Sequence, residues 1–252
     1  MSRTLLDRLL QPVRPRPIAS FAPPARELAP GLWRLERKLR MPGGLVLPVA
    51  MTIVRLPSGG LFLHSPIALD DEVGRTIEGL GPVVALLAPN SFHYVFIGDY
   101  VKRFPQARLF AAPGLTERVP TLPPTTVVGS EAFGAWEQAV EPIVFGPIGS
   151  FAEVVVYHRA SETLVLTDLA FNMVRYENAA DRVGWRLFGV PPRFGASRTA
   201  RFTLLRDPAA AQPFLKRMLE KSFRRILVAH GDPVEASAGE EFERAFRQYL
   251  DG

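Results

Sequence analysis

Short apolar segments that end at turns or at single helices follow one another from Gly31 onward, and this order constrains the fold more than any other feature of the chain. Leu45–Val54 and Leu61–His64 lie on either side of a Gly-Gly turn, a pattern that is typical of a β-hairpin. Ala152–Tyr157 and Thr163–Thr167 flank a short polar turn in the same way. The sequence therefore predicts sheets that are built partly from hairpins.

Helical segments are inserted between these strands and also follow them. Ala68–Leu80 carries three acidic residues near its start and is followed by Gly81-Pro82, which favours a helix with these limits. The apolar runs Val83–Leu87 and Ala107–Ala112, with helix-like residues 92–104 between them, predict a β-α-β unit. The elements expected near the C-terminus are a helix at Ala209–Lys221, a strand at Arg225–Ala229 and an amphipathic helix at Glu235–Leu250. We therefore expect an α/β protein.

Prolines dominate the beginning of the chain. The segment Gln11–Pro30 contains six prolines, which exclude a continuous helix and weaken strand pairing. We therefore predict a Pro- and Arg-rich N-terminal arm over residues 1–30, followed by a single domain over residues 31–252.

The composition is that of a globular protein that can bury a sizeable core. The chain has 252 residues, of which 47% are hydrophobic and 22% are charged. No apolar run reaches the roughly 18 residues that a membrane-spanning helix needs, so we expect a cytoplasmic protein without a membrane partner. The absence of cysteine excludes disulfide bonds, thiolate nucleophiles and zinc sites with cysteine ligands.

The net charge of +5 raises the question of nucleic-acid binding. The arginines are scattered along the whole length, and no basic run with interleaved aromatic residues occurs. The densest segments, Arg14–Arg16 and Arg193–Arg206, are also rich in proline and glycine. We therefore expect the positive charge to cover a solvated surface and expect no nucleic-acid partner.

Three segments resemble landmarks of the metallo-β-lactamase superfamily, in the same order along the chain. Leu-Leu-Ala-Pro-Asn-Ser-Phe-His-Tyr at residues 86–94 is placed like the strand that enters the family's Thr-His-x-His-x-Asp-His metal loop. Leu-Val-Leu-Thr-Asp at residues 164–168 resembles the strand that ends in Gly-Asp, and Ile-Leu-Val-Ala-His-Gly-Asp at residues 226–232 resembles the late strand that ends in Gly-His-Gly. A weaker match is residues 61–66. The resemblance implies an αββα sandwich, with two mixed β-sheets flanked by helices.

The first of these segments departs from the family pattern in its metal ligands. In the simplest alignment Pro89 and Ser91 occupy the first two histidine places, His93 occupies the aspartate place and Tyr94 the last histidine place. Residues 146–150 resemble the family's second metal loop without its histidine. Because proline cannot coordinate a metal through its side chain, the resemblance implies a reduced site that lacks the dinuclear ligand set.

His93, Asp168 and His230 are the candidate catalytic and metal-ligating residues, with His64 as a further candidate ligand. Each follows or ends a predicted strand, where α/β active sites gather. Gly231 allows a sharp turn that would direct the His230 ring across the sheet end. Each candidate also has a local alternative: His93 as a hydrogen-bond partner near a helix start, Asp168 in an Asx turn or a cap, His230 as a strand cap, and His64 as a polar turn residue at the hairpin exit. His158 is assigned to solvent at the other end of the hairpin. We expect the three candidate side chains to lie within about 12 Å of one another, since the ligands of one zinc ion sit about 2 Å from it.

Substrate contacts are expected from Asn90, Tyr94, Trp185 and Phe188. Asn90 has the alternative role of a helix cap and Tyr94 that of a core aromatic. Trp185 and Phe188 lie in the long segment 174–202, which we predict to be irregular. Because the corresponding region of the superfamily often forms part of the substrate wall, the resemblance implies a lid with an aromatic lining here. The alternative is that this segment packs its aromatic residues onto the sheet or onto a second copy of the chain.

Two functions remain open from the sequence. The first is a hydrolase-like protein with a single divalent metal ion, either zinc, iron or manganese, that acts on a small molecule. The second is a metal-free relative that binds a small molecule or a protein partner without catalysis. The loss of ligands favours the second, whereas the position of the remaining histidines favours the first.

Overall fold

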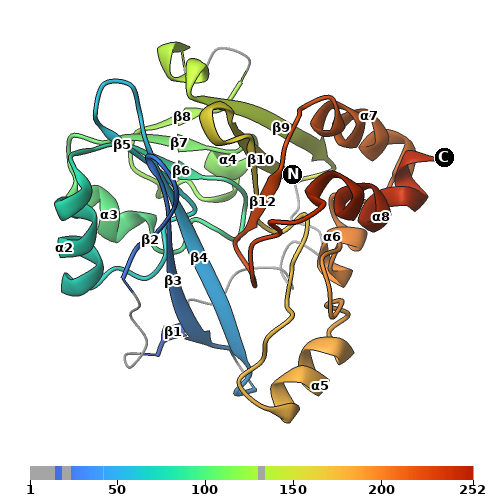
Figure 1. Cartoon of the computed structure of the whole chain (residues 1–252). Helices are drawn as coiled ribbons and strands as arrows, with labels where there is room; N and C mark the ends of the chain where they lie inside the picture. The colour runs from blue at the N-terminus through green and yellow to red at the C-terminus, as the bar shows by residue number, and fades with distance from the viewer. Residues whose placement is uncertain (1–14, 19–23, 42, 130–133, 252) are drawn as a thin grey trace.

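The computed structural model describes residues 15–18, 24–41, 43–129 and 134–251. Two β-sheets face each other, with helices α2 and α3 outside one sheet and helices α7 and α8 outside the other (Figure 1). This arrangement confirms the predicted αββα sandwich. No helix in these described ranges is long and apolar enough to cross a membrane.

The first sheet has eight strands and combines antiparallel and parallel pairs. Its order is β1-β3-β4-β5-β6-β7-β8, and β2 also pairs with β3. The pairs from β3 to β5 are antiparallel and those from β5 to β8 are parallel. The strands are β1 (Arg16–Pro17), β2 (Arg26–Ala29), β3 (Leu32–Arg40), β4 (Val46–Arg55), β5 (Leu61–His64), β6 (Val83–Ala88), β7 (Arg108–Ala111) and β8 (Thr125–Val127). The predicted first hairpin is the β4–β5 pair.

The second sheet has four strands in the order β12-β11-β10-β9. They are β9 (Val140–Ile148), β10 (Phe151–His158), β11 (Thr163–Leu166) and β12 (Arg225–Val228). The β10–β11 pair is the predicted second hairpin, and β12 adds to it in parallel. Because β5 and β6 run parallel in one sheet and β11 and β12 run parallel in the other, several strand ends meet at one edge of the sandwich.

The helices are α2 (Asp71–Leu80), α3 (Ile97–Arg103), α4 (Leu115–Arg118), α5 (Ala179–Leu187), α6 (Arg198–Phe202), α7 (Pro208–Leu219) and α8 (Ala238–Leu250), with 3-10 turns at Gly134–Gln138 and Arg159–Ser161. Helix α2 starts where Asp70 accepts a hydrogen bond from the Val73 backbone N–H. Asp207 caps α7 in the same way, and Pro208 occupies its first turn. Local capping therefore determines where these helices begin.

Three apolar layers hold the sandwich together. The middle layer lies between the sheets and contains Phe62 and Phe110 from the first sheet and Val154 and Val156 from the second, all fully buried. A second layer joins the outer face of the first sheet to α2 and α3, and a third joins the outer face of the second sheet to α7 and α8. Burial of apolar area of this kind is the main favourable term in folding.

Several sequence predictions are wrong in detail. His158 is buried rather than solvent-exposed, because its Nδ1 contacts the Ser161 hydroxyl, which in turn donates to Thr163. The segment 174–202 is not irregular throughout, since it contains α5 and α6. Residues 146–148, predicted as part of a loop, belong to the long strand β9. Within the predicted arm, β1 and β2 both pair with β3, whereas residues 1–14 and 19–23 lie outside the described ranges.

Candidate metal site

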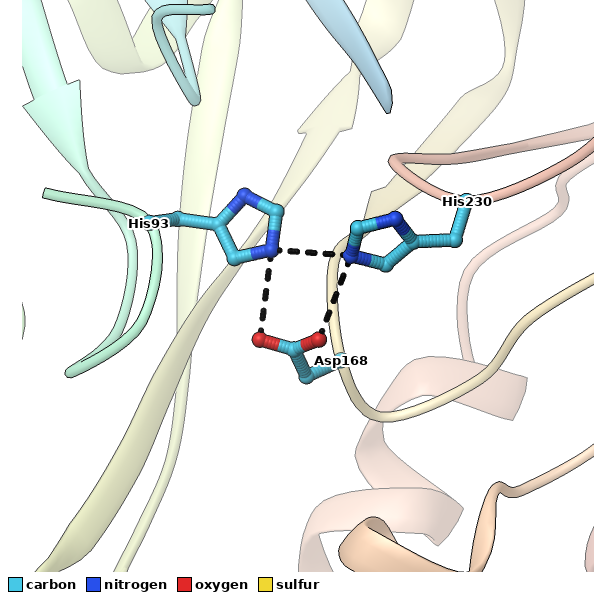
Figure 2. Close-up of side chains that lie close together, drawn as sticks. All are labelled: His93, Asp168 and His230. Atoms are coloured by element: carbon cyan, nitrogen blue, oxygen red, sulfur yellow. Dashed lines mark hydrogen bonds and ion pairs between the residues drawn. The ribbon is translucent and has the colours of Figure 1, made fainter. Parts of the chain in front are cut away.

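His93, Asp168 and His230 come from three different connections at one edge of the sandwich. His93 lies in the turn after β6, Asp168 follows β11 and His230 follows β12. Their side chains point toward one another (Figure 2). The folding of two separate sheets therefore brings together residues that are up to 137 positions apart in the sequence.

The ligand atoms of the three side chains all lie within 4.8 Å of one another. His93 Nε2 is 3.1 Å from His230 Nε2 and 3.2 Å from Asp168 Oδ2. His230 Nε2 is 3.4 Å from Asp168 Oδ1. The predicted convergence of these residues is confirmed.

The backbone determines which nitrogen of His230 faces the site. Its Nδ1 lies 3.0 Å from the Pro48 carbonyl oxygen, which can only accept a hydrogen bond. The proton of a neutral His230 ring therefore sits on Nδ1, and Nε2 presents a lone pair to His93 and Asp168. Histidines that ligate metals are commonly held in this way, with the second ring N–H donated to a backbone carbonyl.

His93 and Asp168 are also oriented by neighbouring polar groups. His93 Nδ1 lies 2.6 Å from the Ser65 hydroxyl oxygen, which leaves Nε2 directed into the site. Asn90 donates a hydrogen bond of 2.8 Å to Asp168 Oδ2. Burial opposes ionisation of Asp168, but the adjacent His93 and His230 more than offset it and lower the pKa of the carboxyl group far below its usual range. Asp168 is therefore a carboxylate at neutral pH.

These distances fit a single divalent metal ion. A tetrahedral ion with bonds of about 2.0–2.1 Å to nitrogen and oxygen places its ligand atoms about 3.3 Å apart. The observed separations of 3.1, 3.2 and 3.4 Å are close to that value, although Asp168 faces the two histidines with different oxygens. Two imidazole lone pairs and a carboxylate also need a cation or a proton between them. The donor set therefore matches a site with three protein ligands and an open position.

Asn90 holds both the backbone at His93 and the Asp168 side chain, and it has no free polar group left for a substrate contact. Its side-chain oxygen accepts from the backbone N–H groups of Phe92 and His93 in the manner of a cap, although it caps a turn, since α3 begins only at Ile97. Its amide nitrogen donates to Asp168 and to the Thr167 hydroxyl. The expectation of a substrate contact is thus replaced by the alternative local role, extended to Asp168.

Glu153 supports the candidate site and was not selected from the sequence. Its carboxylate is fully buried near the start of β10 and accepts hydrogen bonds from the backbone N–H groups of Thr167, Asp168 and Leu169 at 2.7 to 2.9 Å. Burial and the nearby Asp168 carboxylate raise the pKa of Glu153, and the hydrogen bonds from Thr167 offset part of this effect. Glu153 therefore fixes the backbone that carries Asp168. The signal in the sequence was a lone carboxylate within an apolar strand, which is costly unless it is paired.

Replacing Glu153 with glutamine is expected to destabilise the protein by about 2 kcal/mol. The amide would keep one acceptor oxygen but would direct its N–H groups toward backbone donors, which leaves buried groups unsatisfied. Chemical denaturation at pH 7 measures this change, with Glu162→Gln at the exposed β10–β11 turn as the matched control. An equal effect of both variants would show that the loop does not depend on the buried carboxylate.

Arg34 and Gly231 hold the loop that carries His230. The Arg34 guanidinium is almost fully buried and donates to the carbonyl oxygens of Val228 and Gly231. Gly231 has a φ of +100°, and its Cα approaches the Asn172 backbone so closely that an added Cβ would lie 2.1 Å from the Asn172 carbonyl oxygen. The expected turn at Gly231 is therefore present, and its reason is both conformational and steric.

His64 does not join the cluster, contrary to its prediction as a further ligand. Its ring is buried at the end of β5, where Nε2 donates to the Val154 carbonyl oxygen at 3.3 Å. Burial lowers the pKa of His64 to about 3. The ring is therefore neutral in the folded protein and serves as a link between the two sheets.

Buried His64 is expected to make the protein sensitive to acid. The unfolded chain binds a proton at His64 near pH 6.5, whereas the folded chain does so only near pH 3. The contribution of neutral His64 to the free energy of unfolding is therefore fully present above pH 6.5 and is lost as the pH falls below it. From pH 6.5 to 5 the loss is up to about 2 kcal/mol. In His64→Gln, whose amide retains a donor toward Val154, the free energy of unfolding should fall less over this range. If the free energy of unfolding depended on pH equally in His64→Gln and in the original protein, His64 would not be the buried neutral ring described.

A cavity of about 460 Å³ opens beside the three residues. His93, Asp168 and His230 all line it, and so do Trp185 of α5 and Phe188 directly after that helix. Tyr94 instead packs against the apolar layer between the outer face of the first sheet and helices α2 and α3. The predicted aromatic lining is thus present, while Tyr94 takes the alternative role of a core aromatic.

Comparisons with known proteins relate the whole architecture to one fold. The metallo-β-lactamase from Hirschia baltica matches with a TM-score of 0.56 and 12% identity, over 88% of this chain and 98% of that one. FIM-1 from Pseudomonas aeruginosa, in its mono-zinc form, matches with a TM-score of 0.54 and 11% identity, over 91% and 98% of the respective chains. The flavodiiron protein from Giardia intestinalis matches with a TM-score of 0.63 and 13% identity, over 90% of this chain but only 59% of that longer one.

The sequence comparisons are narrower. No functionally curated protein matches the chain significantly. Residues 30–180 match the family described as "Domain of unknown function (DUF4336)". This match covers more than half of the chain and includes two of the three residues of the candidate site. The chain therefore belongs to the DUF4336 family and carries the metallo-β-lactamase fold that the sequence resemblance implied.

Proposed function

We propose that this protein binds one divalent metal ion through His93, Asp168 and His230 and hydrolyses a small molecule held in the adjacent cavity. The observation that carries the proposal is the convergence of two imidazole Nε2 atoms and a carboxylate at separations of 3.1 to 3.4 Å. The contact between His230 Nδ1 and the Pro48 carbonyl supports it further, because it commits the other nitrogen to the site. The position beside a cavity supports a role in reaction rather than in structure alone.

When bound, the metal ion would lower the pKa of a coordinated water and polarise a substrate carbonyl. The protein's contribution is to hold the three ligand side chains before the metal arrives. Asn90 orients Asp168, Ser65 orients His93, and Pro48 keeps the His230 proton on Nδ1. The largely apolar wall of the cavity gives a substrate a surface to pack against beside these ligands.

A single metal ion is favoured over two. Pro89 and Ser91 provide no imidazole where the superfamily pattern has one, and the Pro89 carbonyl already accepts from the Val154 backbone N–H at 2.7 Å. Zinc, iron and manganese all suit a ligand set of imidazole and carboxylate. The names of fold relatives, a mono-zinc form of FIM-1 and a flavodiiron protein, support zinc and iron as the first metals to test.

A metal-free binding protein is the second candidate function. It is favoured by the 3.1 Å contact between the two Nε2 atoms, which a shared proton next to the Asp168 carboxylate also satisfies. In that case the same cavity would hold a ligand or a protein segment without catalysis. Activity measurements with and without metal separate the two functions.

The test is hydrolysis of 4-nitrophenyl esters and of a simple aliphatic lactone by untagged protein. The protein is freed of metal with a chelator and then loaded separately with Zn²⁺, Fe²⁺ or Mn²⁺. We expect turnover with at least one metal and its loss when the chelator is added back. Turnover that is indifferent to the chelator would contradict the role of the metal ion. No turnover with any metal would contradict the hydrolytic proposal and leave the metal-free binding function.

A further inference from the structure

We propose that the cavity selects an uncharged, largely apolar molecule, with a carbonyl group at the His93–Asp168–His230 end and an aliphatic or aromatic tail elsewhere. The placement of the carbonyl rests on the proposed hydrolytic function, whereas the apolar and uncharged character rests on the lining alone.

The wall of the cavity is largely apolar and includes side chains from two neighbouring parts of the structure. Strands β3 and β4 and the connection between them supply side chains that include Leu39, Leu47 and Val49. Helix α5 supplies Trp185, and Phe188 follows directly after its last residue. The Trp185 ring N–H is already used in a hydrogen bond to the Val46 carbonyl oxygen, so this side chain offers the cavity no unsatisfied donor. A ligand therefore gains mainly from burial of apolar surface along most of its length.

Charge is confined to one end of this wall. Among the described residues that line the cavity, the ionisable side chains are His93, Asp168 and His230. The chain contains 30 lysines and arginines, yet none is found in the described lining. An anionic group on the tail would lose its hydration without gaining a cation, and a cationic group would lie among apolar side chains. The lining thus disfavours charged tails of either sign.

The rim offers a place to change this selectivity without disturbing the fold. Phe188 lines the cavity but is 63% exposed, and Leu187 beside it is 76% exposed and does not line the cavity. Either side chain can be replaced by arginine with little loss of buried surface. Phe188→Arg and Leu187→Arg are therefore a matched pair that differ in access to the ligand.

The experiment measures binding of two probes of similar length, 2-nonanone and octanoate, to the metal-free full-length protein by isothermal titration calorimetry. We expect octanoate to bind at least about tenfold more weakly than 2-nonanone, because its carboxylate must lie either beside the Asp168 carboxylate or among apolar side chains that offer no lysine or arginine. Equal or tighter binding of octanoate would overturn the inference. So would a failure of 2-nonanone to bind.

The variant pair tests the location. Phe188→Arg should weaken 2-nonanone binding and strengthen octanoate binding, so that the ratio of the two dissociation constants changes by about tenfold or more in favour of octanoate. Leu187→Arg should leave both dissociation constants unchanged. Equal behaviour of the two variants would place the ligand outside this cavity. Because the titrations use metal-free protein, 2-nonanone binding without ester hydrolysis after metal loading would reject the proposed function and retain this inference.

Discussion

Replacing Gly231 with alanine is expected to destabilise the protein by about 3 kcal/mol or more. Two effects add at this position. The φ of +100° is strained for any residue with a Cβ, and the new Cβ would lie 2.1 Å from the Asn172 carbonyl oxygen and within 2.8 Å of the Met173 backbone nitrogen. Both neighbours are backbone atoms, so relief requires movement of the segment itself. Chemical denaturation, or the midpoint of thermal unfolding, measures the loss.

Gly239→Ala in α8 is the matched control for this substitution. Its φ is ordinary and an added Cβ meets no atom within 4 Å. Alanine is favoured over glycine within a helix by up to about 1 kcal/mol, so this variant should be as stable as the original protein or slightly more stable. If Gly231→Ala behaved like Gly239→Ala, the path of the loop that carries His230 would be different from the one described.

Replacing Asp168 with asparagine is expected to weaken metal binding by at least about 100-fold. The amide has nearly the same shape as the carboxylate but removes its negative charge. It would also place an N–H₂ group or a neutral oxygen opposite Asn90, which now donates to Asp168 Oδ2. Competition with a chromogenic chelator measures the affinity for Zn²⁺. Metal-dependent hydrolysis should fall with it.

Asp232→Asn provides the control for the loss of one negative charge nearby. Asp232 lies two residues after His230 and forms an ion pair with Arg175, which is 79% exposed. Exposed ion pairs contribute little, about 0–1 kcal/mol. Metal affinity should therefore change by no more than a few-fold. A loss as large as that of Asp168→Asn would show that general charge, rather than coordination, controls binding.

The predicted fold was accurate where local patterns carry the information. The apolar runs Val83–Leu87 and Arg225–Ala229 correspond to strands β6 and β12, and the two hairpins are present. His93 and His230 could be selected because polar residues at strand ends stand out against such runs. Their partnership with Asp168 followed from the resemblance to known metal loops, since spacing alone does not bring distant loops together.

The groups that hold the site in place depend on contacts that no local pattern reveals. Arg34 reaches the Val228 carbonyl across 194 residues, and His230 reaches the Pro48 carbonyl across 182. The prediction for His158 failed for a different, local reason: a hairpin end is usually exposed, but the hydroxyl group of Ser161, three residues away, contacts the buried ring. Long-range contacts therefore determine how the loop of His230 is held, and sequence periodicity does not report them.

The central claim is that one divalent metal ion is held by His93, Asp168 and His230. Its most direct test is the metal content of the unmodified, untagged chain, measured by elemental analysis after reconstitution and gel filtration. We predict about one equivalent of zinc, iron or manganese per chain, lost in His230→Ala. Two tightly held zinc ions per chain, or no retained metal at all, would contradict the account.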